Sequence, residues 1–161
     1  MLEVAKHIMV GVLHEEEAPL VQAAFAHRRS CTVTLLQGHR EFVRAALKLN
    51  RREAPCICIF RQEVAVGPAI DLVKLLKNKP FLKRMCLVVL IPTPDARRIE
   101  ALYELGVNSV VVVPHDATVA GPLWEEIATY WTNPMVARPT HFNPITRSPS
   151  QLPAPEFPDE D

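Results

Sequence analysis

Five short apolar runs alternate with five amphipathic segments along residues 1–132, and this alternation constrains the fold more than any other feature. The runs fall at 7–13, 31–36, 56–60, 85–91 and 109–113. They are almost continuously hydrophobic, which is typical of strands that are buried on both faces of a parallel sheet. We therefore predict a three-layer α/β fold in which helices cover both faces of a five-stranded parallel sheet. Strand order 2-1-3-4-5 is expected, because right-handed crossovers leave few topologies.

Glycine, proline and aspartate mark the ends of several predicted helices. Gly67 and Pro68 are expected to open the third helix. Asp95 can cap the fourth helix, which Gly106 ends. Pro122 is expected in the first turn of the last helix. Proline has no backbone N–H, and in the first turn of a helix that group has no partner within the helix.

Residues 133–161 differ in composition from the rest of the chain. They hold seven of the fifteen prolines, which prevent a regular helix or a central strand. We expect a domain at 1–132, followed by a proline-rich arm that is partly disordered. The last six residues, 156–161, carry four acidic side chains. The basic second helix could dock an acidic partner or this acidic end, although a solvated helix face is the simpler interpretation.

Charge and cysteine content exclude several classes of function. Basic and acidic residues both number 18, so nothing favours bulk attraction to nucleic acid or to an anionic membrane. No apolar run is long enough to span a bilayer, and the first residues lack the pattern of a signal peptide, so a cytoplasmic protein is expected. The four cysteines are expected to be buried free thiols that hold no metal.

Three stretches resemble the receiver domains of response regulators, in particular the small stand-alone receivers associated with bacterial phytochromes. AIDLVKLLKNKPFLKRMCLVVL (69–90) is similar to the third helix and fourth strand of that family. ALYELGVNSVVVVP (101–114) resembles its Y-E-L-G-A-N-S-Y-V-V-K-P segment, and IATYW (127–131) resembles the end of its fifth helix. The resemblance spans residues 8–131 and implies a flavodoxin-like receiver fold. In receivers, an aspartate at the end of the third strand accepts a phosphoryl group with the help of Mg²⁺.

Each chemical position of a receiver carries an unsuitable side chain in this sequence. The phosphoacceptor position falls on Arg61, the Thr/Ser position on Ile91 and the lysine position on Val113. The two metal-binding acids fall on Leu13 and His14. A guanidinium can neither accept a phosphoryl group nor lie beside Mg²⁺ without repulsion. The resemblance therefore implies a degenerate pseudo-receiver that is not phosphorylated and that uses no metal or other cofactor.

A one-residue shift of this alignment gives an alternative assignment. Glu15 would then be a surviving metal-binding acid, and Glu63, two residues beyond Arg61, could be proposed as the nucleophile. Ile91 and Val113 would still lack the groups that bind phosphoryl oxygens, which favours the degenerate interpretation.

A buried arginine at a strand end needs a partner, because an unpaired buried charge is strongly destabilising. The acids after the first strand, Glu15, Glu16 and Glu17, are nearest by topology, and an ion pair to one of them would replace the metal ion. Alternatively, Arg61 could bind a small anion together with polar residues at the neighbouring strand ends. The residues of this anion site would be His14, Thr93 and His115. Neither a nucleophile nor a carboxylate pair is placed for catalysis, so we do not expect an enzyme.

Aromatic residues gather in the last predicted helix, at Trp124, Tyr130 and Trp131. Such side chains often anchor interfaces, although helical spacing could also make them part of the core. The receivers that this chain resembles are often homodimers, so the resemblance implies a homodimer whose contact includes Met135 and Val136 of the arm. A sensor kinase or another signalling protein would be a further partner. We expect a phosphorylation-independent signalling module that acts through protein–protein interaction. The alternative is a sensor of a small anion or metabolite.

Overall fold

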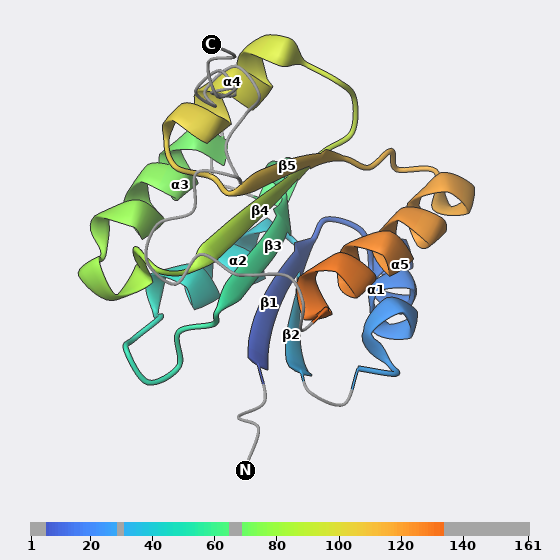
Figure 1. Ribbon diagram of the computed structural model, residues 1–161, viewed down its shortest axis with the longest axis horizontal. Coiled ribbons are helices and arrows are strands. Elements are labelled where there is room, and N and C mark those ends of the chain that lie inside the picture. The colour runs from blue at the N-terminus through green and yellow to red at the C-terminus, as the bar shows by residue number, and fades with distance from the viewer. Residues whose placement is uncertain (1–5, 29–30, 65–68, 134–161) are drawn as a thin grey trace, which may run out of the picture.

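The computed structural model describes residues 6–28, 31–64 and 69–133, in which five strands alternate with five α-helices (Figure 1). The strands are β1 Lys6–Val12, β2 Cys31–Gln37, β3 Ile57–Arg61, β4 Cys86–Ile91 and β5 Ser109–Val112. The helices are α1 Ala18–Phe25, α2 His39–Leu47, α3 Ala69–Asn78, α4 Ala96–Glu104 and α5 Ala117–Thr132. Short 3-10 turns occur at η1 Glu15–Glu17, η2 Gln62–Val64 and η3 Pro80–Leu82. The predicted alternation is confirmed.

The five strands form one parallel sheet in the order β2-β1-β3-β4-β5, as predicted. Every strand therefore points the same way, and the carboxyl ends of all five lie along one edge of the sheet. In parallel α/β sheets this edge is where functional residues gather. Because β3 is the central strand, a side chain at its end is surrounded by residues from both neighbouring strands.

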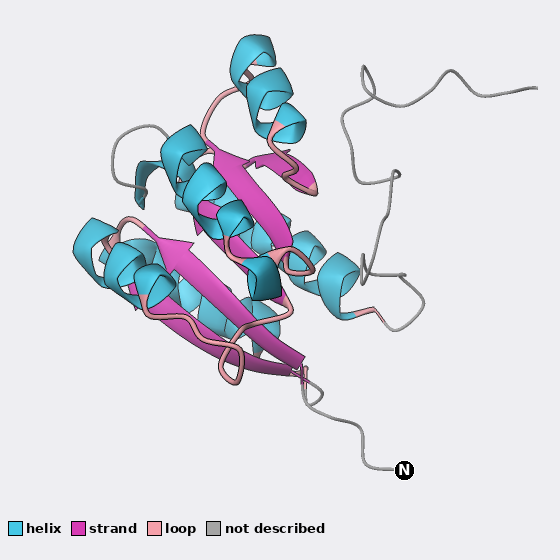
Figure 2. Cartoon of the chain, turned by 90° about the vertical axis from the view of Figure 1, so that its left-hand side faces the viewer, coloured by secondary structure: helices cyan, strands magenta, loops and turns pink. Residues whose placement is uncertain are grey.

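Helices cover both faces of the sheet, which makes the predicted three layers (Figure 2). On one face, Phe42 of α2, Leu76 of α3 and Leu102 of α4 pack in a single buried cluster. On the other face, Val21 of α1 and Trp124 of α5 belong to a second buried cluster. Strands β3 and β4 are buried along their whole length and contribute to both clusters. This double burial explains why their sequences are continuously apolar.

Both predicted ends of α4 are confirmed. The side chain of Asp95 accepts a hydrogen bond from the backbone N–H of Arg98 at 3.2 Å, which caps the first turn. Gly106 follows the helix with a φ of 98°, a left-handed conformation that only glycine adopts readily.

The prediction for Pro122 is wrong, because this residue lies inside α5 and not in its first turn. The helix begins earlier, at Ala117, since the side chain of Asp116 accepts a hydrogen bond from the backbone N–H of Thr118 at 2.9 Å. Pro122 offers no N–H to the carbonyl of Thr118 four residues before it. Pro122 is exposed, so water can hydrate that carbonyl without disturbing the core.

Several sequence-based expectations lie outside the described residues. They include Gly67 and Pro68 as the start of the third helix, and Met135 and Val136 in the arm. The described part of the chain ends just after α5, so the boundary between a domain and an arm stays a prediction. Among the described helices, none combines the length and the hydropathy needed to cross a membrane.

Gly11 of β1 is required by the close approach of α2. A Cβ atom added at Gly11 would lie 2.4 Å from Cδ2 of Phe42, a fully buried ring. We expect Gly11→Ala to lower the free energy of unfolding by about 1–3 kcal/mol, because the core becomes overpacked. Urea denaturation measures this change.

Gly121→Ala in α5 is the matched control. Its added Cβ would lie 3.6 Å from Cδ2 of Leu20, an ordinary contact. Alanine is the better helix former, so this variant should gain about 0.5–1 kcal/mol. A Gly11→Ala protein as stable as the wild type would contradict the close approach.

Candidate functional site

The alternation of side chains along β3 directs Arg61 toward α1 and α5. Cys58 and Phe60 face the cluster under α2, α3 and α4, whereas Ile57 and Ile59 face the cluster under α1 and α5. Arg61 is the last residue of the strand and continues the second set. The strand begins and ends one residue later than predicted, at Ile57 and Arg61, and the backbone of Arg61 still pairs with β4. A long cationic side chain is thereby placed inside the protein.

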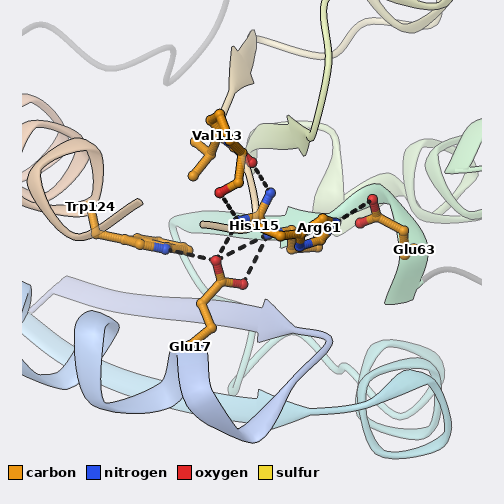
Figure 3. A network of polar contacts seen from close by, with 7 residues as sticks. Glu17, Arg61, Glu63, Val113, His115 and Trp124 are labelled. Atoms are coloured by element: carbon orange, nitrogen blue, oxygen red, sulfur yellow. Dashed lines mark hydrogen bonds and ion pairs between the residues drawn. The ribbon is translucent and has the colours of Figure 1, made fainter. Parts of the chain in front are cut away.

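Arg61 is 0% exposed and forms hydrogen bonds with all three of its guanidinium nitrogens (Figure 3). Its Nε lies 2.9 Å from Oε1 and 3.1 Å from Oε2 of Glu17, and its Nη2 lies 2.5 Å from Oε2. Nη1 donates to the carbonyl of Val113, and Nη2 donates to the carbonyl of Pro114 at 3.2 Å. The guanidinium thus joins the loop after β1, the end of β3 and the segment after β5.

Glu17 is the carboxylate of this ion pair, and neither Glu15 nor Glu16 takes part in it. The sequence left the choice among the three open, and the structure leaves Glu15 and Glu16 exposed. The 3-10 turn η1 determines which acid faces Arg61. It is closed by a hydrogen bond from the Glu17 N–H to the His14 carbonyl at 3.1 Å. With about three residues per turn, only one of three successive side chains can face the sheet.

Trp124 completes the shell around Glu17. Its indole Nε1 donates to Oε2 of Glu17 at 3.1 Å, and the whole residue is 0% exposed. A buried indole N–H requires an acceptor, and this carboxylate supplies it. The pair of charges is therefore removed from water, but each charge keeps strong charge-assisted hydrogen bonds. Such a network is costly to disturb, because losing one member leaves a buried charge without its partner.

The other positions that align with the chemical residues of receivers are largely filled by apolar groups. Ile91 is 1% exposed within the cluster under α2–α4, and Val113 is 0% exposed within the cluster under α1 and α5. Leu13 is half-buried and packs against the first of these clusters. Val113 reaches Arg61 only through its carbonyl. The strand ends around Arg61 form part of the packed core.

Two histidines lie near the ion pair, and neither is among the hydrogen-bond partners of Arg61 in the described part of the chain. The rings of His14 and His115 meet edge to face with centroids 5.8 Å apart, and Nε2 of His115 lies 3.4 Å from Oε1 of Glu63. Thr93 is exposed and, among the described residues, forms no hydrogen bond with these histidines or with Arg61. The sequence predicted that His14, Arg61, Thr93 and His115 converge on one anion. Of these four side chains, the structure brings the rings of His14 and His115 together.

A hollow of about 290 Å³ opens beside the histidines. It is lined by His14, Glu16, Glu17, Leu20, His115 and Ala117. Arg61 is not part of the lining, and two of the lining side chains are carboxylates, which repel anions. Charge complementarity therefore does not favour a small anion in this hollow.

The cysteines are free thiols, of which Cys58 and Cys86 are buried and Cys31 and Cys56 half-buried. Burial raises the pKa of Cys86 to about 12, and it raises the pKa of Cys58 as well. Burial therefore disfavours the thiolate, which is the form of cysteine that binds metal. Within the described residues, no group of three or more His, Cys, Asp and Glu side chains is placed to hold a metal ion.

The three aromatic side chains of α5 differ in exposure. Trp124 and Trp131 are 0% and 3% exposed in the cluster under α1 and α5, so the core accounts for both rings. Tyr130 is 51% exposed, and its ring packs edge-on against Trp131 with centroids 4.9 Å apart. Tyr130 is thus the member of the predicted interface set that is available to a partner, while Met135 and Val136 lie outside the described residues.

Comparisons with known proteins identify the fold. Neither a family model nor a curated protein matches the sequence. The Mn²⁺-bound form of response regulator Rcp1 gives a TM-score of 0.68 at 19% identity, covering 83% of this chain and 99% of that one. The phosphorylated cyanobacterial phytochrome response regulator RcpA gives 0.69 at 19% identity, with 84% and 99% covered. A receiver domain from Rhodospirillum rubrum gives 0.66 at 16% identity, with 84% and 99% covered. The chain has the flavodoxin-like receiver fold.

The ion pair between Arg61 and Glu17 should dominate local stability. We expect Arg61→Met and Glu17→Gln each to lower the free energy of unfolding by about 3–5 kcal/mol, because either change leaves a buried charge unpaired or strips its hydrogen bonds. The double variant should lose less than the sum, with a coupling energy of about 2 kcal/mol. Urea denaturation of all four proteins gives the cycle.

Arg98→Met is the matched control, because Arg98 pairs with Asp95 at 3.8 Å on the surface. An exposed pair of this kind contributes about 0.2–1 kcal/mol. Additive single changes at Arg61 and Glu17, or an Arg61→Met protein as stable as the control, would contradict the assigned role of the buried pair.

Proposed function

We propose that this protein is a phosphorylation-independent signalling module with a receiver fold that acts through protein–protein interaction. The observation that carries the proposal is the ion pair of Arg61 with Glu17, which occupies the end of β3 where receivers carry their phosphoacceptor. The resemblance seen in the sequence supports the same correspondence for Ile91 and Val113. A degenerate pseudo-receiver of this kind keeps the receiver fold but cannot accept a phosphoryl group at the end of β3.

Two features oppose aspartyl phosphorylation at this site. Arg61 has no nucleophilic oxygen, and its positive charge would repel a divalent cation. Glu17 is the carboxylate that faces Arg61, and it already accepts hydrogen bonds from Arg61 and Trp124. Metal binding would have to break these contacts. The same features support a role without catalysis, so we propose that the protein is not an enzyme.

The alternative function, a sensor of small anions, is supported less well. It requires an arginine that can be reached from solvent and has donors to spare. Arg61 is instead fully buried and bonded to Glu17, Val113 and Pro114. A strand-end pocket that is filled in this way favours an interaction module over a ligand sensor.

The proposed interaction surface is an apolar stripe on α5. Val119 is 44% and Tyr130 is 51% exposed, and half-buried Leu123 lies between them. Their spacing of four and seven residues brings all three to one side of the helix. Aromatic and aliphatic side chains of this kind are enriched at interfaces. Because the receivers that this chain resembles often dimerise through their last helix, we propose a homodimer through this stripe.

A sensor kinase or another signalling protein is a further proposed partner. The resemblance is the support for this part of the proposal, since kinases are the usual partners of receivers. The cytoplasmic location stays a prediction from the sequence.

Sedimentation velocity tests the proposed dimer directly. The full chain should sediment as a dimer at micromolar concentration, and Tyr130→Glu should weaken dimerisation by about tenfold or more, because a charge replaces an interface aromatic. Adding Mg²⁺ and acetyl phosphate should leave the sedimentation coefficient unchanged.

Leu47→Glu is the matched control, since Leu47 is equally exposed, at 50%, but belongs to α2 on the opposite face of the sheet. Its dimer should be as stable as that of the wild type. A monomeric wild type, an equal effect of both variants, or dimers that form only with the phosphodonor would each contradict the proposal.

A further inference from the structure

A basic surface lies at the amino ends of the strands, opposite the edge that holds Arg61. It is formed by the loop between α2 and β3 and by the segment between α3 and β4, at the lower left of Figure 1. We call it the basic loop surface, and its cations are Lys48, Arg51, Arg52, Lys79, Lys83 and Arg84. All of them are exposed except Lys79, which is half-buried and donates to the carbonyl of Leu47 at 3.0 Å. The proposed signalling role makes no use of this surface.

A hollow of about 420 Å³ lies at the centre of the basic loop surface. It is lined by Arg51, Pro80, Phe81 and Arg84. Its volume falls within the range of about 300–1,000 Å³ that is usual for pockets that accept small ligands. The two arginines come from different loops, so the hollow joins segments that are about 30 residues apart in the sequence.

The cations around the hollow are not neutralised within the described residues. Neither Arg51 nor Arg84 forms an ion pair there. The nearest acid in the sequence is Glu53, whose carboxylate accepts a hydrogen bond from Nδ2 of Asn50 at 3.1 Å. Two arginines beside an aromatic ring suit an acidic segment with an aromatic residue, since guanidinium groups bind carboxylates bidentately and also stack on rings.

The chain itself contains such a segment. Residues 156–161 read EFPDED and combine four carboxylates with Phe157, and no basic residue lies between 148 and 161. We propose that this acidic segment docks in cis on the basic loop surface. Phe157 enters the hollow beside Phe81, and the acids pair with Arg51 and Arg84. Although the net charge of the whole chain is zero, the basic loop surface and the acidic residues 156–161 carry opposite charges.

The geometry of the fold permits this docking. Helix α5 runs against the direction of the strands, so its last residue, Thr132, lies at the same end of the sheet as the basic loop surface. The 22 residues from 134 to 155 can span about 70 Å in the extended form that proline-rich segments favour. That reach exceeds the diameter of a domain of this size, which is about 40 Å.

Zero-length crosslinking of the full chain tests the proposal. A carbodiimide joins a carboxylate to a lysine amine only when the two are in contact, and peptide mapping by mass spectrometry locates the link. The acids of 156–161 should be joined mainly to Lys48 and Lys83, and at least about fivefold less to Lys74, an exposed lysine of α3. Raising the salt from about 0.1 M to about 1 M should abolish the links, because the screening length falls from about 10 Å to about 3 Å.

Charge reversal and isotope mixing supply the controls. The variant Arg51→Glu/Arg84→Glu should lose the links by about fivefold or more, whereas Arg97→Glu, at an exposed position of α4, should keep them. All three positions of the reversal experiments, Arg51, Arg84 and Arg97, are on the surface, so thermal melting should show an intact fold. An equal mixture of ¹⁴N and ¹⁵N protein should give links within one isotope, as docking in cis requires.

Three results would overturn the proposal. Links spread evenly over all exposed lysines would mean that the acidic segment has no preferred site. Links to Lys48 and Lys83 that survive the double charge reversal would mean that Arg51 and Arg84 do not hold it. Links of mixed isotope would place the segment on a second copy of the chain. None of these results bears on the phosphorylation-independent role of the opposite edge.

Discussion

The buried ion pair between Arg61 and Glu17 is the interaction on which the functional edge of this protein depends. It connects η1, the end of β3, the segment after β5 and helix α5 through hydrogen bonds to Glu17, Val113, Pro114 and Trp124. A fully bonded buried pair adds little net stability over an apolar core, but it is unfavourable to break. The pair therefore fixes one arrangement of the edge more than it raises overall stability.

In the proposed function, this arrangement separates the scaffold of a receiver from its chemistry. The sheet order, the helical layers and the overall shape match solved receiver domains with TM-scores near 0.7. At the end of β3, however, lies the guanidinium of Arg61, at the position to which the sequence resemblance assigns the phosphoacceptor carboxylate. In the proposed function, the charge pair holds this edge of the sheet in one arrangement, and phosphorylation plays no part. Binding energy must then come from surfaces, such as the stripe of Val119, Leu123 and Tyr130 on α5.

Much of the fold follows from the sequence, because buried parallel strands leave continuous apolar runs and helix caps leave local signals such as Asp95 and Gly106. The start of α5 was predicted too late, because proline was taken as the signal for the first turn. The helix instead begins after its cap, Asp116, which lies six residues before Pro122. At the site, the sequence pointed to an arginine and to three adjacent acids. It could not choose Glu17, because the choice depends on the phase of a three-residue turn. The indole of Trp124 was also missed as a partner, because 107 residues separate it from Glu17. The apolar sequence around Trp124 indicates that the ring is buried, and a buried indole N–H needs an acceptor. That need is the one signal in the sequence that points to a polar partner for Trp124.

The central claim is that a charge pair, and not a phosphoryl switch, occupies the end of β3. Intact-mass spectrometry at neutral pH, after incubation of the full chain with acetyl phosphate and Mg²⁺, tests it most directly. The mass should stay unchanged at all incubation times, because Arg61 has no nucleophilic oxygen and the Glu17 carboxylate beside it already accepts hydrogen bonds from Arg61 and Trp124. A gain of one phosphoryl group that depends on Mg²⁺, mapped to a residue next to this edge of the sheet, would contradict the account.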